Sequence, residues 1–350
     1  MLYSQYNGDQ LILHPRNGIN GKNRVSAVIE CVLGYSFRYV HDFRPLLITE
    51  VSCDFRVTGN VRTSRVPDQC PGSYNAVGFY VPFSIYGHRF FDLYYICFDE
   101  TNATPIYTHH TVYGNEIQYR CTTSFRPVFK VPGFPKNLDV TSAYSQYNQE
   151  NRLTALFASD SKPRESAMEY FDENYLQKGH LTPHADGLFT TWQWSSYFYI
   201  NVVGMWERIN NGNWKFLEEK VRTIANATKQ NLDIYTGAYD TLSLCSLQHY
   251  CNKFTLSNGR IPVPKWLWKI VKSPENNAAI ALVVSNNPFV DELPICGQGH
   301  ESYGWNKNIV TGRTHGAVSY CSVQDLKRIV RNIPREALAP YILKVVYSNG

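Results

Sequence analysis

Hydrophobic residues recur at helical spacing within residues 210–227, which read NNGNWKFLEEKVRTIANA. Trp214, Leu217, Val221 and Ile224 are separated by three, four and three positions, a spacing typical of the buried face of an amphipathic helix. Apolar runs at 232–237, 261–271 and 277–285 predict strands of a central sheet, and VQDLKRIVRN at 323–332 predicts another helix. Helices that follow strands in an irregular order favour an α+β fold.

Residues 1–130 show a different pattern, in which short alternating segments are broken by Gly, Pro and Asn. NGINGKN at 17–23 and PDQCPG at 67–72 read as turns, while FFDLYYICF at 90–98 is rich in the aromatic residues that strands prefer. VPGFPKN at 131–137 reads as a linker. We therefore predict a small β-rich N-terminal module over residues 1–130 and a second domain over residues 131–350.

The composition is that of a globular chain. Of the 350 residues, 43% are hydrophobic and 18% are charged, which supplies material for a sizeable core. The formal net charge of +5 suits a polyanionic partner without identifying one. No run of 18 apolar residues occurs, so no membrane-spanning helix is predicted. The oligomeric state stays open.

Nine cysteines are scattered along the chain without a CxxC pair, which argues against a structural zinc site. Scattered cysteines favour disulfides formed in an oxidising compartment, and the glycosylation sequons at Asn102 and Asn226 point the same way. The first ten residues, MLYSQYNGDQ, lack the pattern of a signal peptide. The prediction of a secreted protein therefore requires that a leader has already been removed.

One candidate site centres on YLQKGHLTPHAD at residues 175–186. We expect Gly179 to free the backbone beside His180, and Pro183 to end any helix or central strand soon afterwards. A single histidine in such a stretch is compatible with an ordinary turn. Only partners elsewhere in the chain would give it a chemical role.

The predicted helix supplies such partners. Asn210, Trp214, Glu218 and Arg222 are four residues apart, so they follow one side of the helix beside its apolar stripe. Asn210 would lie at the helix N-terminus, where the helix dipole favours anions and polar ligands. Taken singly, Asn210 also reads as an N-cap, and Glu218 with Arg222 as a solvated ion pair.

Two motifs in register resemble one enzyme family. KGHLTP at 178–183 is similar to the Arg-Gly-His signature of the DNA/RNA non-specific endonucleases, the Serratia-nuclease-like ββα-metal enzymes. The helix resembles their second motif, with Asn210, Gly212, Trp214, Leu217-Glu218 and Arg222 at the family's spacing. Asn201 lies nine positions before Asn210, as a family asparagine does. The C-terminal half and the N-terminal module look like the secreted arthropod branch.

The resemblance implies a fold and a reaction. The fold would be a ββα-metal nuclease fold with a central antiparallel sheet and flanking helices. The reaction would be hydrolysis of DNA and RNA at the phosphate backbone, with His180 as the general base and Asn210 holding Mg²⁺, or alternatively Mn²⁺. Glu218 would orient water on the metal, and Arg222 would pair with the phosphate.

Further roles follow from the same resemblance. Lys178 would stabilise the transition state, and Asn201 would contact the substrate. Arg164, in SKPRES, is the candidate for an upstream phosphate-binding arginine of the family.

Departures from the family pattern leave two functions open. Gln177 and Lys178 stand where the bacterial pattern has Asp-Arg, and lysine lacks the planar fork that grips a phosphate with two bonds. The chain is predicted to be either a working sugar-non-specific endonuclease or a secreted nucleic-acid-binding protein with attenuated cleavage. A purely structural extracellular module would leave the matched spacing to coincidence. The sequence does not indicate a preference for DNA or RNA, or for single or double strands.

Other chemistry-bearing residues have plain interpretations. His184 and Asp186 could line a groove or form an ordinary turn, and His109-His110 in IYTHHTVYG are predicted to lie on a strand surface. Three tryptophans are predicted to lie in the core: Trp192, Trp194 and Trp206. Three basic residues are predicted to lie on a solvated helix face: Lys327, Arg328 and Arg331.

Overall fold

The computed structural model describes residues 59–65, 70–82, 88–122, 125–172, 174–297 and 302–345, together with the backbone of five earlier strands. Those five form two small sheets of their own, β2-β1-β3 and β4-β5. Their bounds are β1 Tyr3–Tyr6, β2 Asp9–Ile12, β3 Ala27–Val28, β4 Tyr35–Phe37 and β5 Cys53–Arg56.

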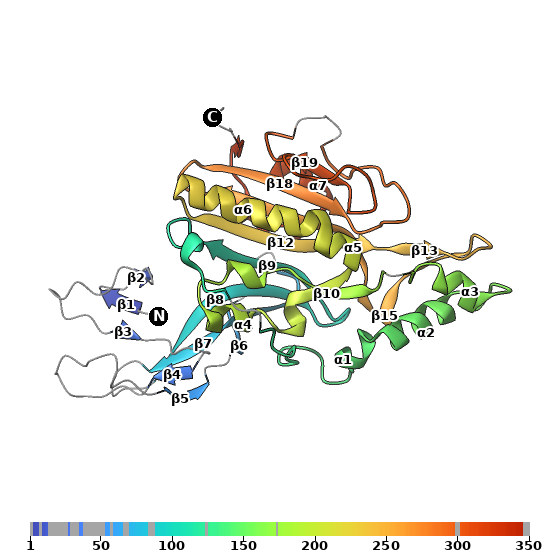
Figure 1. Ribbon diagram of the computed structural model, residues 1–350, viewed down its shortest axis with the longest axis horizontal. Coiled ribbons are helices and arrows are strands. Elements are labelled where there is room, and N and C mark those ends of the chain that lie inside the picture. Colours follow the sequence, from blue (N-terminus) through green and yellow to red (C-terminus); the bar gives the residue numbers. More distant parts are fainter. Residues whose placement is uncertain are drawn as a thin grey trace.

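A nine-stranded sheet forms the centre of the molecule (Figure 1). Its strands are β6 Asn60–Thr63, β7 Ser73–Pro82, β8 His88–Asp99, β9 Thr104–Val112, β12 Leu232–Thr241, β17 Pro264–Ser273, β18 Ala278–Ser285, β19 Val318–Cys321 and β20 Tyr341–Ile342. Their order is β19-β18-β17-β12-β9-β8-β7-β6, and β20 also pairs with β18. Neighbouring strands run antiparallel except for β20, which runs parallel to β18. Together with its helices, this sheet confirms the predicted α+β fold.

Short strands and helices surround the sheet. Paired short strands are β10 Leu176–His180 with β11 Val202–Trp206, β13 Ser243–Cys245 with β14 Cys251–Lys253, and β15 Thr255–Ser257 with β16 Arg260–Pro262. The α-helices are α1 Val140–Ala143, α2 Gln146–Leu156, α3 Pro163–Met168, α4 Thr190–Ser195, α5 Glu207–Ile209, α6 Lys215–Thr228 and α7 Val323–Ile329. The 3₁₀ helices are η3 Ile117–Tyr119, η4 His184–Asp186, η5 Tyr199–Asn201 and η7 Arg335–Ala337, and η6 Asn210–Trp214 is a π-helical turn.

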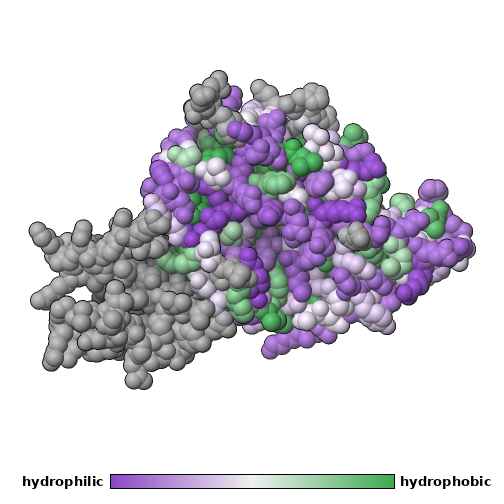
Figure 2. All heavy atoms as spheres, in the orientation of Figure 1, coloured by the Kyte–Doolittle hydropathy of each residue, from purple (hydrophilic) through white to green (hydrophobic). Residues whose placement is uncertain are grey.

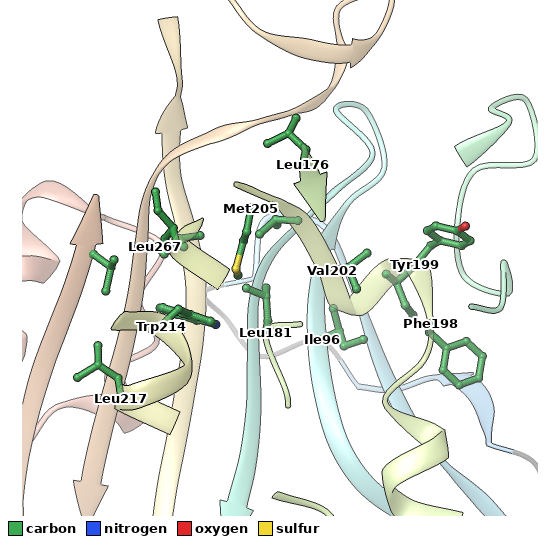
Figure 3. Close-up of a cluster of buried hydrophobic side chains, with 14 of the residues drawn as sticks. Ile96, Leu176, Leu181, Phe198, Tyr199, Val202, Met205, Trp214, Leu217 and Leu267 are labelled. Atoms are coloured by element: carbon green, nitrogen blue, oxygen red, sulfur yellow. The ribbon is translucent and has the colours of Figure 1, made fainter. Parts of the chain in front are cut away.

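Two cores cover the two faces of the sheet, because alternate side chains of a strand point to opposite sides. On β17, Leu267 joins the core that includes Leu217 of α6, whereas Trp268 joins the core that includes Leu326 of α7. Figure 3 shows the first core, in which Leu267 and Trp214 lie near Met205 of β11 and Leu217 lies beyond Trp214. Strands covered on both faces read as the continuous apolar runs seen at β17 and β18.

The sheet continues across the boundary predicted near residue 130. β9 precedes that boundary and β12 follows it, yet the two are paired from Leu232–Val112 to Gly237–Tyr107. The proline-rich stretch at 131–137 lies between these two strands of one hydrogen-bonded sheet. We therefore propose that any separate N-terminal module ends before β6.

The predicted helix at 210–227 is divided in two. α6 begins at Lys215, and the π-helical turn η6 before it contains Gly212 with non-helical angles of φ −94° and ψ −128°. A Cβ added to Gly212 would lie 3.0 Å from both Cβ and the carbonyl oxygen of His315. Asn213 donates side-chain hydrogen bonds to the carbonyls of Val310 and Gly316. The loop at 310–316 thus holds η6 out of line with α6.

Three disulfides lie within the described residues: Cys70–Cys97, Cys245–Cys251 and Cys296–Cys321. Cys121 is a free thiol there, and Cys31 and the side chain of Cys53 lie outside the described residues. Hydrophilic side chains cover most of the described surface seen in Figure 2. None of the helices in the described residues is both long enough and apolar enough to cross a membrane.

Candidate functional site

A groove of about 710 Å³ opens where the end of β10, η4, η6 and the polar side of α6 meet. Four of the residues singled out from the sequence line it, although they come from distant parts of the chain: His180, Asn210, Glu218 and Arg222. β10 and β11 are followed by η6 and α6, so a ββα unit presents all four. The structure therefore brings together most of the predicted site.

His180 ends β10, where it pairs with Val202 of β11. Its ring packs against Tyr197 and Phe129, at centroid distances of 4.8 and 5.2 Å. Its Nε2 atom is buried and has no hydrogen-bond partner within the described part of the chain. Burial, with smaller effects from His184 and Arg126, lowers the pKa of His180 to about 3, so the imidazole is neutral near pH 7.

Gly179 is required for space rather than for backbone freedom. It lies in the regular β10–β11 pair opposite Val203. A Cβ built on it would come within 2.3 Å of the buried Met205 side chain. The expectation of an unusual backbone at this position was therefore wrong, and the adjacent strand explains the glycine.

Glu218 and Arg222 project from α6 into the groove one helical turn apart. Burial raises the pKa of Glu218 to about 7, although the cations Lys269 and Arg222 oppose that shift. Arg222 pairs with a different carboxylate, because its Nη1 atom donates to Oδ1 of Asp186 at 2.7 Å. The reading of Glu218 with Arg222 as a solvated ion pair is thus replaced by a buried pair with Asp186.

Asn210 also lines the groove, on η6 rather than at the start of α6. Its carboxamide makes no hydrogen bond to any residue that the structure describes. No group of three or more His, Cys, Asp or Glu side chains suited to a metal ion occurs among the described residues.

Lys178, Asn201 and Arg164 lie away from the groove lining. Lys178 is on the same face of β10 as His180, where its ammonium lies 5.4 Å from the ring centroid of Phe129 and burial lowers its pKa. Asn201 is fully buried, and its carboxamide is hydrogen-bonded to the backbone of Thr182 and to the carbonyl of Ser196.

Arg164 is exposed on α3. Figure 1 shows α3 at the far end of the projecting α2–α3 arm, away from α6. The structure therefore does not place Arg164 at the groove, because the chain carries it outward on that arm.

The structure adds two arginines that the sequence did not single out. Arg120 and Arg126 line the groove, and Nη1 of Arg126 donates to Nε2 of His184 at 2.8 Å. His184 itself lines the groove, whereas Asp186 is buried behind Arg222. The interpretation of His110 as strand surface was wrong, because it is buried against Asp186. The alternating burial along β9 is the signal that separates His110 from His109.

Sequence comparisons show which known proteins the chain is similar to. The sequence pattern of the DNA/RNA non-specific endonuclease family matches residues 75–322. A salivary endonuclease of Lutzomyia longipalpis is 29% identical over 269 residues, covering 73% of this chain and 61% of that protein. Salivary protein Tsal1 of Glossina morsitans morsitans is 25% identical over 258 residues, covering 72% and 63%. The chain thus spans less than two thirds of the length of these two relatives.

Among solved structures, the EndoG/EndoGI complex is 14% identical with a TM-score of 0.40, covering 71% of this chain and 88% of that one. The family match takes in β10, β11 and α6, and so includes His180, Asn210, Glu218 and Arg222. The chain belongs to the DNA/RNA non-specific endonuclease family.

Proposed function

We propose that this protein is a metal-dependent endonuclease that hydrolyses the phosphodiester backbone of DNA and RNA. The observation that carries the proposal is the meeting of four groups in one groove: the imidazole of His180, the carboxamide of Asn210, the carboxyl group of Glu218 and the guanidinium of Arg222. Phosphodiester hydrolysis needs a base for the attacking water, positive charge beside the phosphate and protonation of the leaving oxygen. The groove offers residue types for the first two requirements.

His180 would accept the proton of the attacking water. Its imidazole lines the groove in the neutral form, and a neutral imidazole can accept a proton. The aromatic rings of Tyr197 and Phe129 restrict its orientation. A base held in one orientation loses less entropy in reaching the transition state.

Arg222 and Arg126 would bind phosphate. Arg222 has donors left over after its bond to Asp186, and a guanidinium matches two phosphate oxygens at once. Arg126 lies beside His184 at the groove, which makes it a better candidate than Arg164 for the upstream phosphate-binding arginine. Contacts to the backbone alone suit a substrate range without sequence preference.

The groove residues fit a hard divalent cation. Asn210 offers a carboxamide oxygen that makes no other hydrogen bond among the described residues, and Glu218 adds a carboxylate that could hold water on the ion. We infer Mg²⁺, with Mn²⁺ as the alternative. When bound, such an ion neutralises charge that develops on the phosphate.

The alternative function is nucleic-acid binding with attenuated cleavage, and two observations favour it. An imidazole with a pKa near 3 is a weak base at neutral pH, unless a bound phosphate raises that pKa. Lys178, which replaces an arginine of the family pattern, packs over Phe129 and Tyr199. Such a protein would bind tightly and cleave slowly.

One experiment separates the two functions. Supercoiled plasmid and double-stranded RNA are incubated with the protein in Mg²⁺ or in EDTA, and the products are run on gels. The enzyme function predicts cleavage of both in Mg²⁺ and binding alone in EDTA. His180→Ala, prepared in parallel, controls for a contaminating nuclease. Binding without cleavage by the unmodified protein would establish the alternative.

We also infer that the protein is secreted. Three disulfides within the described residues support an oxidising compartment, and two of the similar proteins are named as salivary. Asn102 is exposed in the turn between β8 and β9, where a glycan would be accommodated. Mass spectrometry before and after enzymatic deglycosylation tests that site.

A further inference from the structure

A buried chain of hydrogen bonds joins the loop after His180 to helix α6. The Asn201 carboxamide bonds both the N–H and the carbonyl of Thr182, each at 2.9 Å. The Thr182 hydroxyl lies 3.4 Å from Nδ1 of His110, and Nε2 of His110 lies 2.8 Å from Oδ2 of Asp186. Oδ1 of Asp186 accepts from Nη1 of Arg222 at 2.7 Å. All five residues are buried.

Asp186 is the junction of this chain, because each of its two carboxylate oxygens takes one partner. Burial alone would raise the pKa of Asp186, but the His110 hydrogen bond and the positive charge of Arg222 outweigh it and lower the pKa to about 2. The side chain is therefore a carboxylate near neutral pH. A buried carboxylate requires such partners, since leaving it unpaired is costly.

The same contacts define which ring nitrogen of His110 carries a hydrogen and how the ring is oriented. Nε2 lies next to a carboxylate that only accepts, so this nitrogen carries the hydrogen and donates it. Nδ1 faces the Thr182 hydroxyl, which is itself carried by the segment that follows His180. A rotation of the ring would break both contacts. The imidazole thus fixes the carboxylate of Asp186 from the side away from Arg222.

We propose that Asp186 and His110 are positioning residues that hold the guanidinium of Arg222 toward the groove, in register with the loop that follows His180. The inference rests on the proposed function of Arg222 as a phosphate ligand. Nη1 makes the hydrogen bond to Asp186, and no other hydrogen bond of the Arg222 side chain occurs among the described residues. The remaining N–H donors are left for the substrate, and the hydrogen bond to the buried Asp186 sets their direction.

The proposal separates cleavage from binding. Asp186→Asn preserves shape and one acceptor but removes the charge that anchors Arg222. We expect single-turnover cleavage in Mg²⁺ to fall by about 10- to 100-fold, the scale of loss when a catalytic group is misplaced by 1 Å. Affinity for a labelled duplex in EDTA should stay the same or rise, because the variant carries one negative charge fewer.

Substitutions at His110 test the hydrogen bond between His110 and Asp186. His110→Gln can offer an amide N–H near the position of Nε2, whereas His110→Leu offers none. We expect the cleavage rate to decrease in the order parent, His110→Gln, His110→Leu. Glu292→Gln is the matched control, since it breaks a partly buried ion pair with Lys265 that does not line the groove. It should leave the cleavage rate unchanged.

Side-chain NMR of Arg222 gives a readout that does not require cleavage. In the folded parent protein an Arg222 Hη signal should be resolved and slow to exchange, because Nη1 donates to Asp186, and in Asp186→Asn it should broaden or exchange faster. Failure of the parent to cleave would count against the proposed function. The NMR comparison would still test whether Asp186 positions Arg222. Unchanged Arg222 signals, or unchanged cleavage in a folded Asp186→Asn variant, would overturn the inference.

Discussion

At the scale of single residues, the site combines groups whose charge state depends on burial. His180 is neutral because burial lowers its pKa, whereas Asp186 is ionised because two donors outweigh the same effect. Burial favours the neutral form of both groups, and the partners of Asp186 reverse that outcome. The sequence shows which groups are present but not which partners they find.

The role of His180 leads to the first prediction. His180→Ala should lower Mg²⁺-dependent cleavage by about two to four orders of magnitude, the usual cost of losing a general base. Duplex affinity in EDTA should barely change, because the parent imidazole carries no charge. His249→Ala, at an exposed position outside the groove lining, is the control. Equal rates for parent and His180→Ala would remove His180 from the mechanism.

Asn210 leads to a prediction about the metal. Asn210→Ala should raise the Mg²⁺ concentration needed for half-maximal cleavage by about tenfold or more, since even an indirect metal contact is worth that much. Asn211→Ala, one position along in the same groove, serves as the comparison. Circular dichroism and thermal melting check that both variants fold. If only Asn211→Ala shifts the titration, the metal site lies elsewhere in the groove.

At the scale of elements, the site depends on the break between η6 and α6. The π-helical turn carries Asn210, and α6 carries Glu218 and Arg222. Gly212 permits the break because it has no side chain, which leaves room for His315 to pack against the backbone there. An uninterrupted helix would orient Asn210 differently relative to Glu218.

This packing leads to a prediction for Gly212→Ala. The added methyl group would lie 3.0 Å from the His315 backbone oxygen, so η6 or the 310–316 loop has to shift. We expect a loss of about 1–3 kcal/mol in the free energy of unfolding, together with reduced cleavage. The measurement is urea denaturation. Gly204→Ala is the control, because its Cβ would meet Val263 at an ordinary 3.5 Å. Equal stability of Gly212→Ala and the parent would contradict this account.

At the scale of the whole molecule, one sheet separates two environments. His110 faces the groove side of β9, whereas its neighbour His109 lies on the other face among tyrosines. His109 stacks on Tyr235 at a centroid distance of 4.2 Å. Burial lowers the pKa of His109 to about 4, with Asp233 opposing the shift.

His109 therefore predicts how stability depends on pH. Its pKa in the folded chain is below the ordinary value of about 6.5, so unfolding takes up a proton between about pH 6.5 and 4. As the pH is lowered through that window, the free energy of unfolding should fall by up to about 1.4 kcal/mol per pH unit for each such proton. His109→Phe keeps a ring against Tyr235 and should flatten the slope. The free energy of unfolding is measured against pH for parent and variant, each relative to its own value at pH 8. Equal slopes between pH 6.5 and 4 would refute this assignment.

The sequence alone determined the features that depend on local spacing. Periodicity located the apolar face of α6, and strand-like runs located β17 and β18. Two motifs singled out His180, Asn210, Glu218 and Arg222, which line one groove. Such features depend on residues a few positions apart, which the chain keeps close whatever its overall fold.

Tertiary structure decided everything that depends on distant segments. Asp186 meets His110 across 76 residues and Arg222 across 36, and these pairs follow from strand register and helix packing. The chain carries Arg164 outward on α3 and brings Arg126 to the groove, although the residue type is the same at both positions. Charge and residue type are local properties, whereas the partner that sets a pKa or an orientation is chosen only when the sheet and helices pack.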